Sequence, residues 1–239
     1  MKRIVLAAAC LIVVATVLQA LFDYSRLRDR QLFGHLVHRI DTDRPVVALT
    51  LDDGPTRRFT APLLDILDKA GVTATFFLTG REVTAFPEGA QAVVDAGHEV
   101  GNHSWNHRRM VAMTPWEVRR QLRETDAAIR ALGYEGPLHF RPPYGRKLVV
   151  LPWVLARQDR TTIMWSVEPE TDLAFDAPPQ DLAAHVIETT QAGDIILLHG
   201  MYSGNDSSRA ALPLIIAGLR ARGFDFVTVS ELIALEAAR

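Results

Sequence analysis

The stretch Val46-Val47-Ala48-Leu49-Thr50-Leu51-Asp52-Asp53-Gly54-Pro55 decides the fold class of this chain. Its first six residues form a short apolar run rich in β-branched side chains, which is typical of a buried strand. Two adjacent acids and a Gly-Pro pair then end the run, and Gly-Pro is a turn signal. A helical pattern follows and stops at Gly71, where a C-terminal cap belongs. The stretch therefore predicts a strand that leads through a polar turn into a helix.

The same alternation continues along the rest of the chain. Thr114-Pro115-Trp116-Glu117 forms a capping box that starts a helix, and residues 210–222 form a helix closed by Gly223. Strand patterns lie between the helices, at Ala74–Leu78, Ile163–Ser166, Ile195–Leu198 and Phe226–Val229. Strands that alternate with helices indicate an α/β fold with a parallel sheet, either open or closed into a barrel.

Composition excludes several classes of protein. The chain has 239 residues, of which 48% are hydrophobic and 23% charged, so it is neither disordered nor of low complexity. Its formal net charge of −2 is unlike that of a nucleic-acid binder. A single cysteine, Cys10, excludes an intrachain disulfide framework. Functional sites must therefore be built from carboxylates, histidines and backbone groups.

The N-terminal segment differs from the rest of the chain. Residues 4–22 carry no charge, and this run is long enough for a membrane-spanning helix. We therefore expect residues 1–22 to be a membrane anchor or a signal segment, residues 23–44 a linker, and residues 45–235 the catalytic domain. An uncleaved anchor would place the domain on the outer side of the cell membrane, and a cleaved one would release it by secretion.

Polar clusters follow several strand ends, where α/β proteins gather their chemistry. Asp52 and Asp53 point in different directions, so one could bind a cation while the other serves as a base. An Asx-type turn is the alternative interpretation of this pair. His103 and His107 are four residues apart and would share one face of a helical turn. With an aspartate they make a three-ligand metal set with open positions, which is typical of a catalytic site.

Two further clusters complete the pattern. Phe140-Arg141-Pro142-Pro143-Tyr144-Gly145 is a stiff loop, which could be either a simple rigid turn or a means of placing Arg141 and the Tyr144 backbone. The apolar strand that includes Leu197 ends in His199. A histidine at the mouth of a metal site favours a functional role over a structural one.

These motifs, in this order, resemble those of the polysaccharide deacetylases with a NodB-like domain, over roughly residues 45–235. The resemblance implies a distorted barrel of parallel strands and helices. It also implies an enzyme that removes N- or O-acetyl groups from a polysaccharide such as chitin or peptidoglycan, using a divalent metal, most often Zn²⁺.

The resemblance also implies a role for each matched residue. Asp53, His103 and His107 would hold the metal. Asp52 would be the base, and Arg141 would keep it ionised. His199 would be the general acid. The backbone N–H of Tyr144 would bind the oxyanion, and Leu197 would line the pocket for the acetyl methyl group.

One motif departs from the family pattern. Family members show an Asp-Trp pair where this chain reads Val167-Glu168-Pro169-Glu170-Thr171-Asp172-Leu173. Asp172 is one candidate partner for His199, with Leu173 filling the acetyl pocket, and Glu168 is the rival.

Two other functions stay open on the sequence alone. One is a metal-dependent amidohydrolase acting on a small non-sugar amide, and the other is a non-catalytic anchored carbohydrate-binding protein.

Overall fold

The fold is built around β2 (Val46–Asp52), whose seven residues are all buried. In the computed structural model, which describes residues 2–174 and 177–237, β2 pairs with β6 (Ile195–His199) and β3 (Thr75–Leu78). Its first half also pairs with β7 (Asp225–Val227). On the far side of β3 lies β4 (Glu99–Asn102). All of these pairings are parallel, as the alternation of strands and helices predicted.

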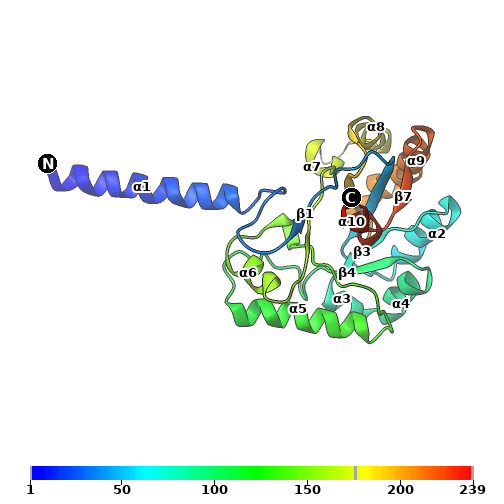
Figure 1. Ribbon diagram of the computed structural model, residues 1–239, viewed down its shortest axis with the longest axis horizontal. Helices are drawn as coiled ribbons and strands as arrows, with labels where there is room; N and C mark the ends of the chain where they lie inside the picture. Colours follow the sequence, from blue (N-terminus) through cyan, green and yellow to red (C-terminus); the bar gives the residue numbers. More distant parts are fainter. Residues whose placement is uncertain (1, 175–176, 238–239) are drawn as a thin grey trace.

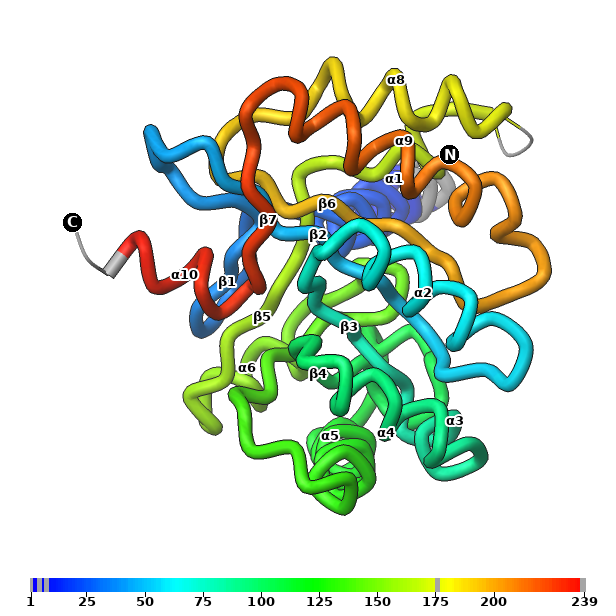
Figure 2. The backbone as a smooth tube through the Cα atoms, turned by 90° about the vertical axis from the view of Figure 1, so that its right-hand side faces the viewer, coloured from blue at the N-terminus to red at the C-terminus, as the bar shows by residue number. Residues whose placement is uncertain are grey.

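The sheet curls into a distorted barrel through short bridges. A second sheet pairs β1 (Leu36–Val37) with β5 (Thr162–Ile163). Phe140 forms parallel bridges to Asn102 and to Thr162, and Val167 bridges to Ile196 on β6. The strands therefore follow one another around a ring that includes single bridges as well as full ladders. Figure 2 shows this ring enclosed by helices.

Most of the helices follow strands, as in other α/β folds. Their bounds are α1 Lys2–Tyr24, α2 Thr60–Ala70, α3 Gly80–Ala85, α4 Pro87–Asp95, α5 Pro115–Arg130, α6 Val150–Ala156, α7 Pro169–Asp172, α8 Pro179–Thr189, α9 Asp206–Ala221 and α10 Val229–Ala237, with short 3-10 turns η1 Pro143–Gly145 and η2 Ser203–Asn205. The predicted capping box at Thr114 and the left-handed cap at Gly71 are both present. The predicted strand at Phe226–Val229 is shorter, because α10 begins at Val229.

The main apolar core lies between the central strands and the helices beside them. Leu49 and Leu51 of β2 contribute to it, and α2 and α9 contribute Leu63, Leu67 and Ile215, all less than 2% exposed. Burial of one such side chain contributes roughly 1.5–3 kcal/mol to folding. This core therefore fixes β2, whose last residues begin the active site.

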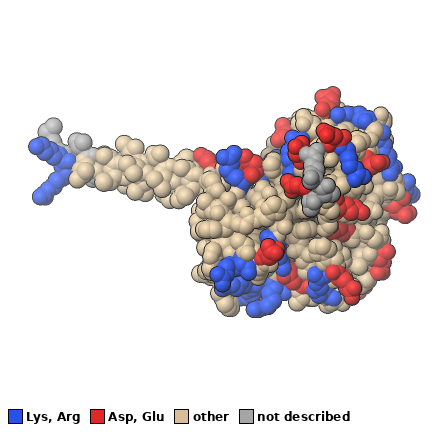
Figure 3. Space-filling model, viewed as in Figure 1, with Lys and Arg blue, Asp and Glu red and all other residues tan. Residues whose placement is uncertain are grey.

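Helix α1 extends away from the body of the molecule (Figure 1). Apolar side chains such as Leu11 and Ile12 are exposed along it. Figure 3 shows the helix free of charged residues along much of its length, with Lys and Arg at its far end. Even so, no helix among the described residues has both the length and the hydropathy needed to cross a membrane, so the predicted membrane span is not supported. Met1 lies outside the described residues.

Residues 23–44 are not the linker that the sequence predicted. Val37 and Ile40 are 3% and 1% exposed. β1 pairs with β5, and the backbone N–H of Ile40 donates to the carbonyl of Gly193. The error arose because this segment is short and lacks periodicity, although it completes a sheet whose other strand lies more than a hundred residues away. The folded domain therefore begins near Ser25, which is also buried.

Candidate active site and metal centre

The two adjacent acids occupy the end of β2. Asp52 is its last residue and pairs in register with His199 of β6. Asp53 follows with a φ of 76°, in the left-handed region that aspartate tolerates better than most residues. Gly54 continues the turn, and a Cβ there would lie 2.7 Å from Met201 Cγ. Asp52 contacts Arg141 and Asp53 faces His107, but both carboxylates also approach His103, whose Nε2 lies 3.5 Å from Asp52 Oδ2 and 3.9 Å from Asp53 Oδ1.

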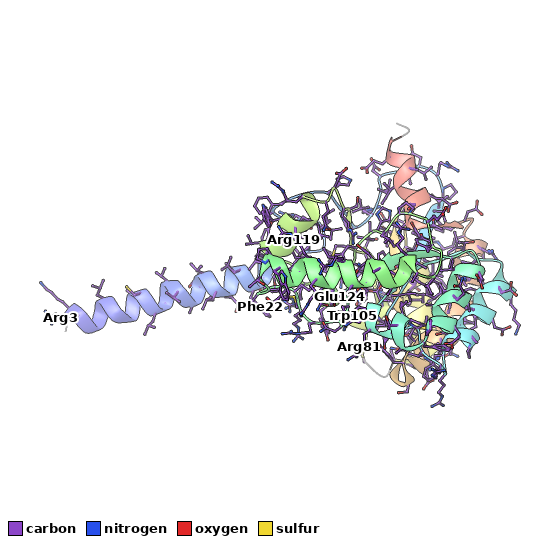
Figure 4. All side chains as sticks on the ribbon, turned by 90° about the horizontal axis from the view of Figure 1, so that it is seen from below. Arg3, Phe22, Arg81, Trp105, Arg119 and Glu124 are labelled. Atoms are coloured by element: carbon purple, nitrogen blue, oxygen red, sulfur yellow. The ribbon has the colours of Figure 1, made fainter. Side chains whose placement is uncertain are left out.

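The two histidines lie on a loop, not in the predicted helical turn. Ser104 and His107 have φ values of 67° and 54°. The side chain of Gln121 on α5 accepts hydrogen bonds from the backbone N–H groups of Trp105 and Asn106, at 2.9 and 3.2 Å. Figure 4 shows Trp105 beside α5. The loop still brings both imidazoles to the same carboxylate, because α5 holds its backbone.

Asp53, His103 and His107 converge on one point. One ligand atom from each lies within 4.8 Å of the other two. His107 Nε2 is 3.5 Å and His103 Nε2 is 3.9 Å from Asp53 Oδ1. This oxygen is buried and has no hydrogen-bond partner among the described residues. A buried carboxylate oxygen faced by two ring nitrogens fits a divalent cation.

The protonation of the histidines also fits a metal. His103 Nδ1 lies 2.8 Å from the carbonyl oxygen of Arg141, so Nδ1 carries the proton and Nε2 presents its lone pair. Burial lowers the pKa of His103 to about 3 and also lowers the pKa of His107. Both rings are therefore neutral, as metal ligands must be. Burial raises the pKa of Asp53 to about 7, and nearby acids act in the same direction while His199 opposes them.

Asp52 is held by the most deeply buried arginine of the fold. Arg141 is 0% exposed, and its Nη1 donates to Asp52 Oδ1 at 2.7 Å and to Thr50 Oγ1 at 2.7 Å. Its other nitrogens donate to the carbonyls of Ile163 and Met164. Burial raises the pKa of Asp52, but the charge and the hydrogen bond of Arg141, with the charge of His199, outweigh it, and the pKa lies below its ordinary value. Asp52 is therefore an ionised carboxylate, as the sequence predicted.

The proline-rich loop places Tyr144 at the pocket. Tyr144 has a φ of 58°, and its ring lies 4.6 Å from that of His107. Gly145 follows with a φ of 64°, and a Cβ there would lie 2.9 Å from the Trp165 ring. The loop is thus more than a simple rigid turn, because Tyr144 packs against His107 and Gly145 lies against Trp165.

His199 has a carboxylate partner, but it is neither of the two predicted ones. Its Nδ1 forms an ion pair with Glu170 Oε2, and its backbone N–H donates to Glu170 Oε1 at 2.9 Å. Ser208 on α9 also donates to Glu170. Glu168 instead pairs with Arg28 at 2.6 Å, and Asp172 lies 3.2 Å from the ring of His185. The two predicted partners were therefore wrong.

The short helix α7 explains this error. It begins at Pro169 and turns the chain so that Glu170 faces the end of β6. Burial lowers the pKa of His199, but the Glu170 carboxylate outweighs it and raises the pKa to about 9. His199 is thus an imidazolium near neutral pH. Glu170 is an acid in the first turn of a short helix, and no spacing rule distinguishes it in the sequence from Glu168 and Asp172.

One pocket brings together the two aspartates, the three histidines and Tyr144, while Arg141 and Glu170 contact Asp52 and His199 from behind its wall. It has a volume of about 510 Å³ and is lined by Asp52, Asp53, His103, His107, Tyr144 and His199. Leu197, Met164, Trp165 and Thr171 form part of its wall. The predicted role of Leu197 in the wall is compatible with this geometry. Leu173 packs against the main core instead, so the prediction that it fills the acetyl pocket was wrong.

Comparisons with known proteins agree with this geometry. The family model for polysaccharide deacetylase matches residues 39–162. A peptidoglycan-N-acetylglucosamine deacetylase of Bacillus cereus is 31% identical over 84% of this chain and 93% of its own length. The peptidoglycan-N-acetylmuramic acid deacetylase PdaC of Bacillus subtilis is 33% identical over 81% of this chain, but only 40% of its own length is covered.

A solved structure shows the same fold. It is a peptidoglycan N-acetylglucosamine deacetylase in complex with 4-naphthalen-1-yl-N-oxidanyl-benzamide. The TM-score is 0.77 at 30% identity, and the match covers 82% of this chain and 92% of that one. The family match, the relatives and the shared fold lead to one conclusion: the chain belongs to the polysaccharide deacetylase family and is a deacetylase.

Proposed function

We propose that this deacetylase is metal-dependent and hydrolyses the acetamido groups of amino sugars in peptidoglycan. The observation that carries the proposal is the content of the pocket. A His-His-Asp ligand set lies beside an ionised carboxylate and a protonated histidine. Amide hydrolysis needs a base for water and an acid for the leaving amine, and the pocket supplies one of each.

The protein groups divide the work of the reaction. Asp52, ionised through Arg141, takes a proton from the attacking water. The backbone N–H of Tyr144 donates to the oxyanion as it develops. His199 then gives its proton to the amine nitrogen of the leaving sugar, and Glu170 stabilises the imidazolium until that moment. Leu197 and Trp165 provide apolar wall for the acetyl methyl group.

The metal is best assigned as Zn²⁺. Asp53, His103 and His107 would hold it, and two imidazoles with one carboxylate form a donor set that zinc prefers. A bound divalent ion would polarise the acetyl carbonyl and lower the pKa of water. Three protein ligands leave coordination positions open for substrate and water, as catalytic sites require.

The substrate and the location are inferred together. Peptidoglycan is the glycan that the names of both sequence relatives contain. Such a substrate lies outside the cytoplasm, so we place the domain on the outer side of the cell membrane. Removing N-acetyl groups is favoured over removing O-acetyl groups, because an amine leaving group needs the proton that His199 carries.

The two other functions considered for the sequence are less well supported. A non-catalytic carbohydrate-binding protein has no need for a buried arginine that keeps a carboxylate ionised beside a metal site. A pocket of about 510 Å³ with four arginines in its wall is also more suited to a polar sugar than to a small apolar amide.

The test is release of acetate by the purified full chain. Peptidoglycan oligosaccharides, chitooligosaccharides, acetylated xylan and small acetamides are compared after the protein is loaded with Zn²⁺ and after treatment with a chelator. We expect metal-dependent release from the amino-sugar substrates. Equal release from the chelated protein would refute metal dependence, and release from acetamides alone would refute the glycan assignment.

A further inference from the structure

Residues Ser25–Arg28, which we call the arm, form one side of the active-site pocket. Ser25 is 2% exposed, and its carbonyl accepts a hydrogen bond from the backbone N–H of Lys147 at 3.1 Å. The Lys147 ammonium donates to the carbonyl of Leu27. These contacts fix the arm on the body at the base of α1, where Figure 4 labels Phe22. They also place Arg26 and Arg28 in the wall of the pocket.

The positive charge of Arg28 is paired with a carboxylate of the protein. Its guanidinium forms an ion pair with Glu168 at 2.6 Å and lies 5.0 Å from the centre of the Trp165 ring. Glu168 Oε2 also accepts a hydrogen bond from Trp165 Nε1 at 2.8 Å. Glu168 is therefore engaged in holding the arm against the pocket wall, and its charge is already matched.

Three other arginines of the pocket wall have no such partner. Among the described residues, no carboxylate lies within ion-pair distance of Arg26, Arg109 or Arg146, although Arg28 in the same wall has one. Each is supported by an aromatic ring instead. Arg109 lies 4.6 Å from the centre of the Tyr144 ring, and Arg146 lies 4.4 Å from that of Phe22. Arg26 lies 5.7 Å from the same Phe22 ring.

The three guanidinium groups repel one another. Burial lowers the pKa of Arg146, and the charges of Arg26 and Arg109 lower it further, while the charge of Asp23 opposes them in part. Arg26 and Arg109 are exposed, so solvent screens part of this repulsion, and an anion bound among the three side chains would offset the rest. The chain holds them there through three separate segments, the arm, the loop after His107, and the loop after Tyr144. Such an arrangement attracts an anion.

The ring of Tyr144 lies between this group of arginines and the metal ligand His107. The Tyr144 ring contacts His107 at 4.6 Å and Arg109 at 4.6 Å. An anion bound by the arginines would therefore sit beside the acetyl group that enters the pocket. Guanidinium groups bind planar carboxylates through paired hydrogen bonds, and they are less strongly hydrated than ammonium groups.

We propose that Arg26, Arg109 and Arg146 form a subsite for a carboxylate of the glycan, and that the enzyme prefers acetylated sugars that carry or adjoin one. This inference rests on the proposed function. In peptidoglycan, each muramic acid bears a lactyl ether on the carbon next to the one that carries its acetamido group, and the carboxylate of this ether is free where the stem peptide has been removed. The subsite therefore selects muramic acid that carries no stem peptide, either as the sugar that loses its acetyl group or as its neighbour.

The test compares two substrates that differ only in this charge. One is a tetrasaccharide of alternating N-acetylglucosamine and N-acetylmuramic acid, and the other is its methyl ester. We expect the native enzyme to favour the free acid in kcat/KM by about tenfold or more, as a hydrogen-bonded charge contact would give. The preference should shrink severalfold in Arg26→Gln and disappear when Arg109→Gln is added. Mass spectrometry of the products shows which of the two sugars lost its acetyl group.

Arg30→Gln is the matched control. Arg30 follows the arm closely but pairs with Asp29 and does not line the pocket. It should keep the native preference, which separates a local contact from a loss of net charge. Arg146→Gln alone would be a poorer test, because Arg146 also donates to Ser25 Oγ at 3.1 Å and its loss could release the arm.

Several outcomes would overturn the inference. Equal hydrolysis of acid and ester by the native enzyme would refute the subsite while leaving the proposed function intact. So would an equal effect of Arg30→Gln and Arg26→Gln. If Arg26→Gln keeps the preference but weakens sedimentation with phosphatidylglycerol vesicles, the arginines bind a lipid surface instead. Failure to release acetate from any glycan would refute the proposed function itself.

Discussion

At the scale of single residues, the site holds a base and an acid together because Asp52 and His199 each have a partner of opposite charge. Arg141 makes Asp52 a carboxylate, and Glu170 makes His199 an imidazolium, so a base and an acid coexist in one pocket. Environments that push two pKa values apart are how enzymes assign such roles. The sequence contained both catalytic residues and Arg141. It could not reveal Glu170, because three acids in five residues differ only in the direction that a short helix gives them.

Replacing Asp52 tests the base. Asp52→Asn keeps the size of the side chain but removes the proton acceptor, and we expect the rate of acetate release to fall by roughly 10²–10⁴-fold. The metal content, measured by atomic emission, should stay near that of the native protein, since Asp53, His103 and His107 are untouched. Asp65→Asn, which changes an exposed acid paired with Lys69, is the control. A normal rate in metal-loaded Asp52→Asn would rule out this role.

Replacing Glu170 tests the acid. The Glu170 carboxylate raises the pKa of His199 to about 9, so the protonated acid is present below that pH and lost above it. Glu170→Gln should lower the pKa, and the basic limb of the pH–rate profile should move to lower pH by about one unit or more. A bound cation would move the basic limb to lower pH in both the native enzyme and Glu170→Gln, and the difference between the two profiles would remain.

The matched control is Asp172→Asn, which removes an acid of the same segment that contacts His185. Its basic limb should stay where the native enzyme has it. The same shift in both variants would show that net charge, and not the contact with Glu170, sets the pKa of His199.

At the scale of elements, the site depends on segments that meet only at the barrel rim. β2 and β6 present Asp52 and His199 in register, and α5 fixes the histidine loop through Gln121. Strand β2 and the capping box of α5 were predictable, since each is set by local sequence. A strand at Ile163–Ser166 was predicted and overlaps β5, but β1 and its pairing with β5 were not, because two residues give no period and the pairing is decided by distant contacts.

Truncation separates α1 from the arm and β1. A chain that lacks residues 2–24 should keep its melting temperature within a few degrees, because α1 extends from the body (Figure 1). A chain that lacks residues 2–44 loses β1 and the buried Val37 and Ile40. Each such side chain contributes roughly 1.5–3 kcal/mol, so this chain should be several kcal/mol less stable. Thermal unfolding measures the melting temperature and urea unfolding the free energy of unfolding, each followed by circular dichroism.

Equal stability of the two truncated chains would mean that residues 25–44 are a linker after all. Loss of stability in the shorter truncation would mean that α1 contributes to the fold of the domain.

At the scale of the whole molecule, the fold class followed from the sequence because parallel α/β proteins put their polar residues at strand ends. Four motifs separated by tens of residues were expected to meet, and they line one pocket. The sequence motifs did not predict that the arm, Ser25–Arg28, forms part of this pocket. Its arginines lack a motif, and only the folded chain shows that they surround the same pocket as Asp53 and His107.

The metal site joins two distant parts of the chain, so metal binding should stabilise the whole domain. Asp53 follows β2 and the two histidines follow β4, and a bound ion would link these segments. A ligand at 100 times its dissociation constant stabilises the folded state by about 2.7 kcal/mol. For a domain of this size, that raises the melting temperature by roughly 5–10 °C. We expect chelation to lower the melting temperature by this amount and Zn²⁺ to restore it.

A pair of histidine variants makes the measurement specific. His107→Ala removes a ligand and should abolish the response of the melting temperature to Zn²⁺ and to chelator. His185→Ala removes a surface histidine that contacts Asp172 and should keep the full response. Because the readout is stability, it does not depend on which glycan is the substrate. A response that survives His107→Ala would place the stabilising metal elsewhere, and the catalytic role of this His-His-Asp set would then lose its physical basis.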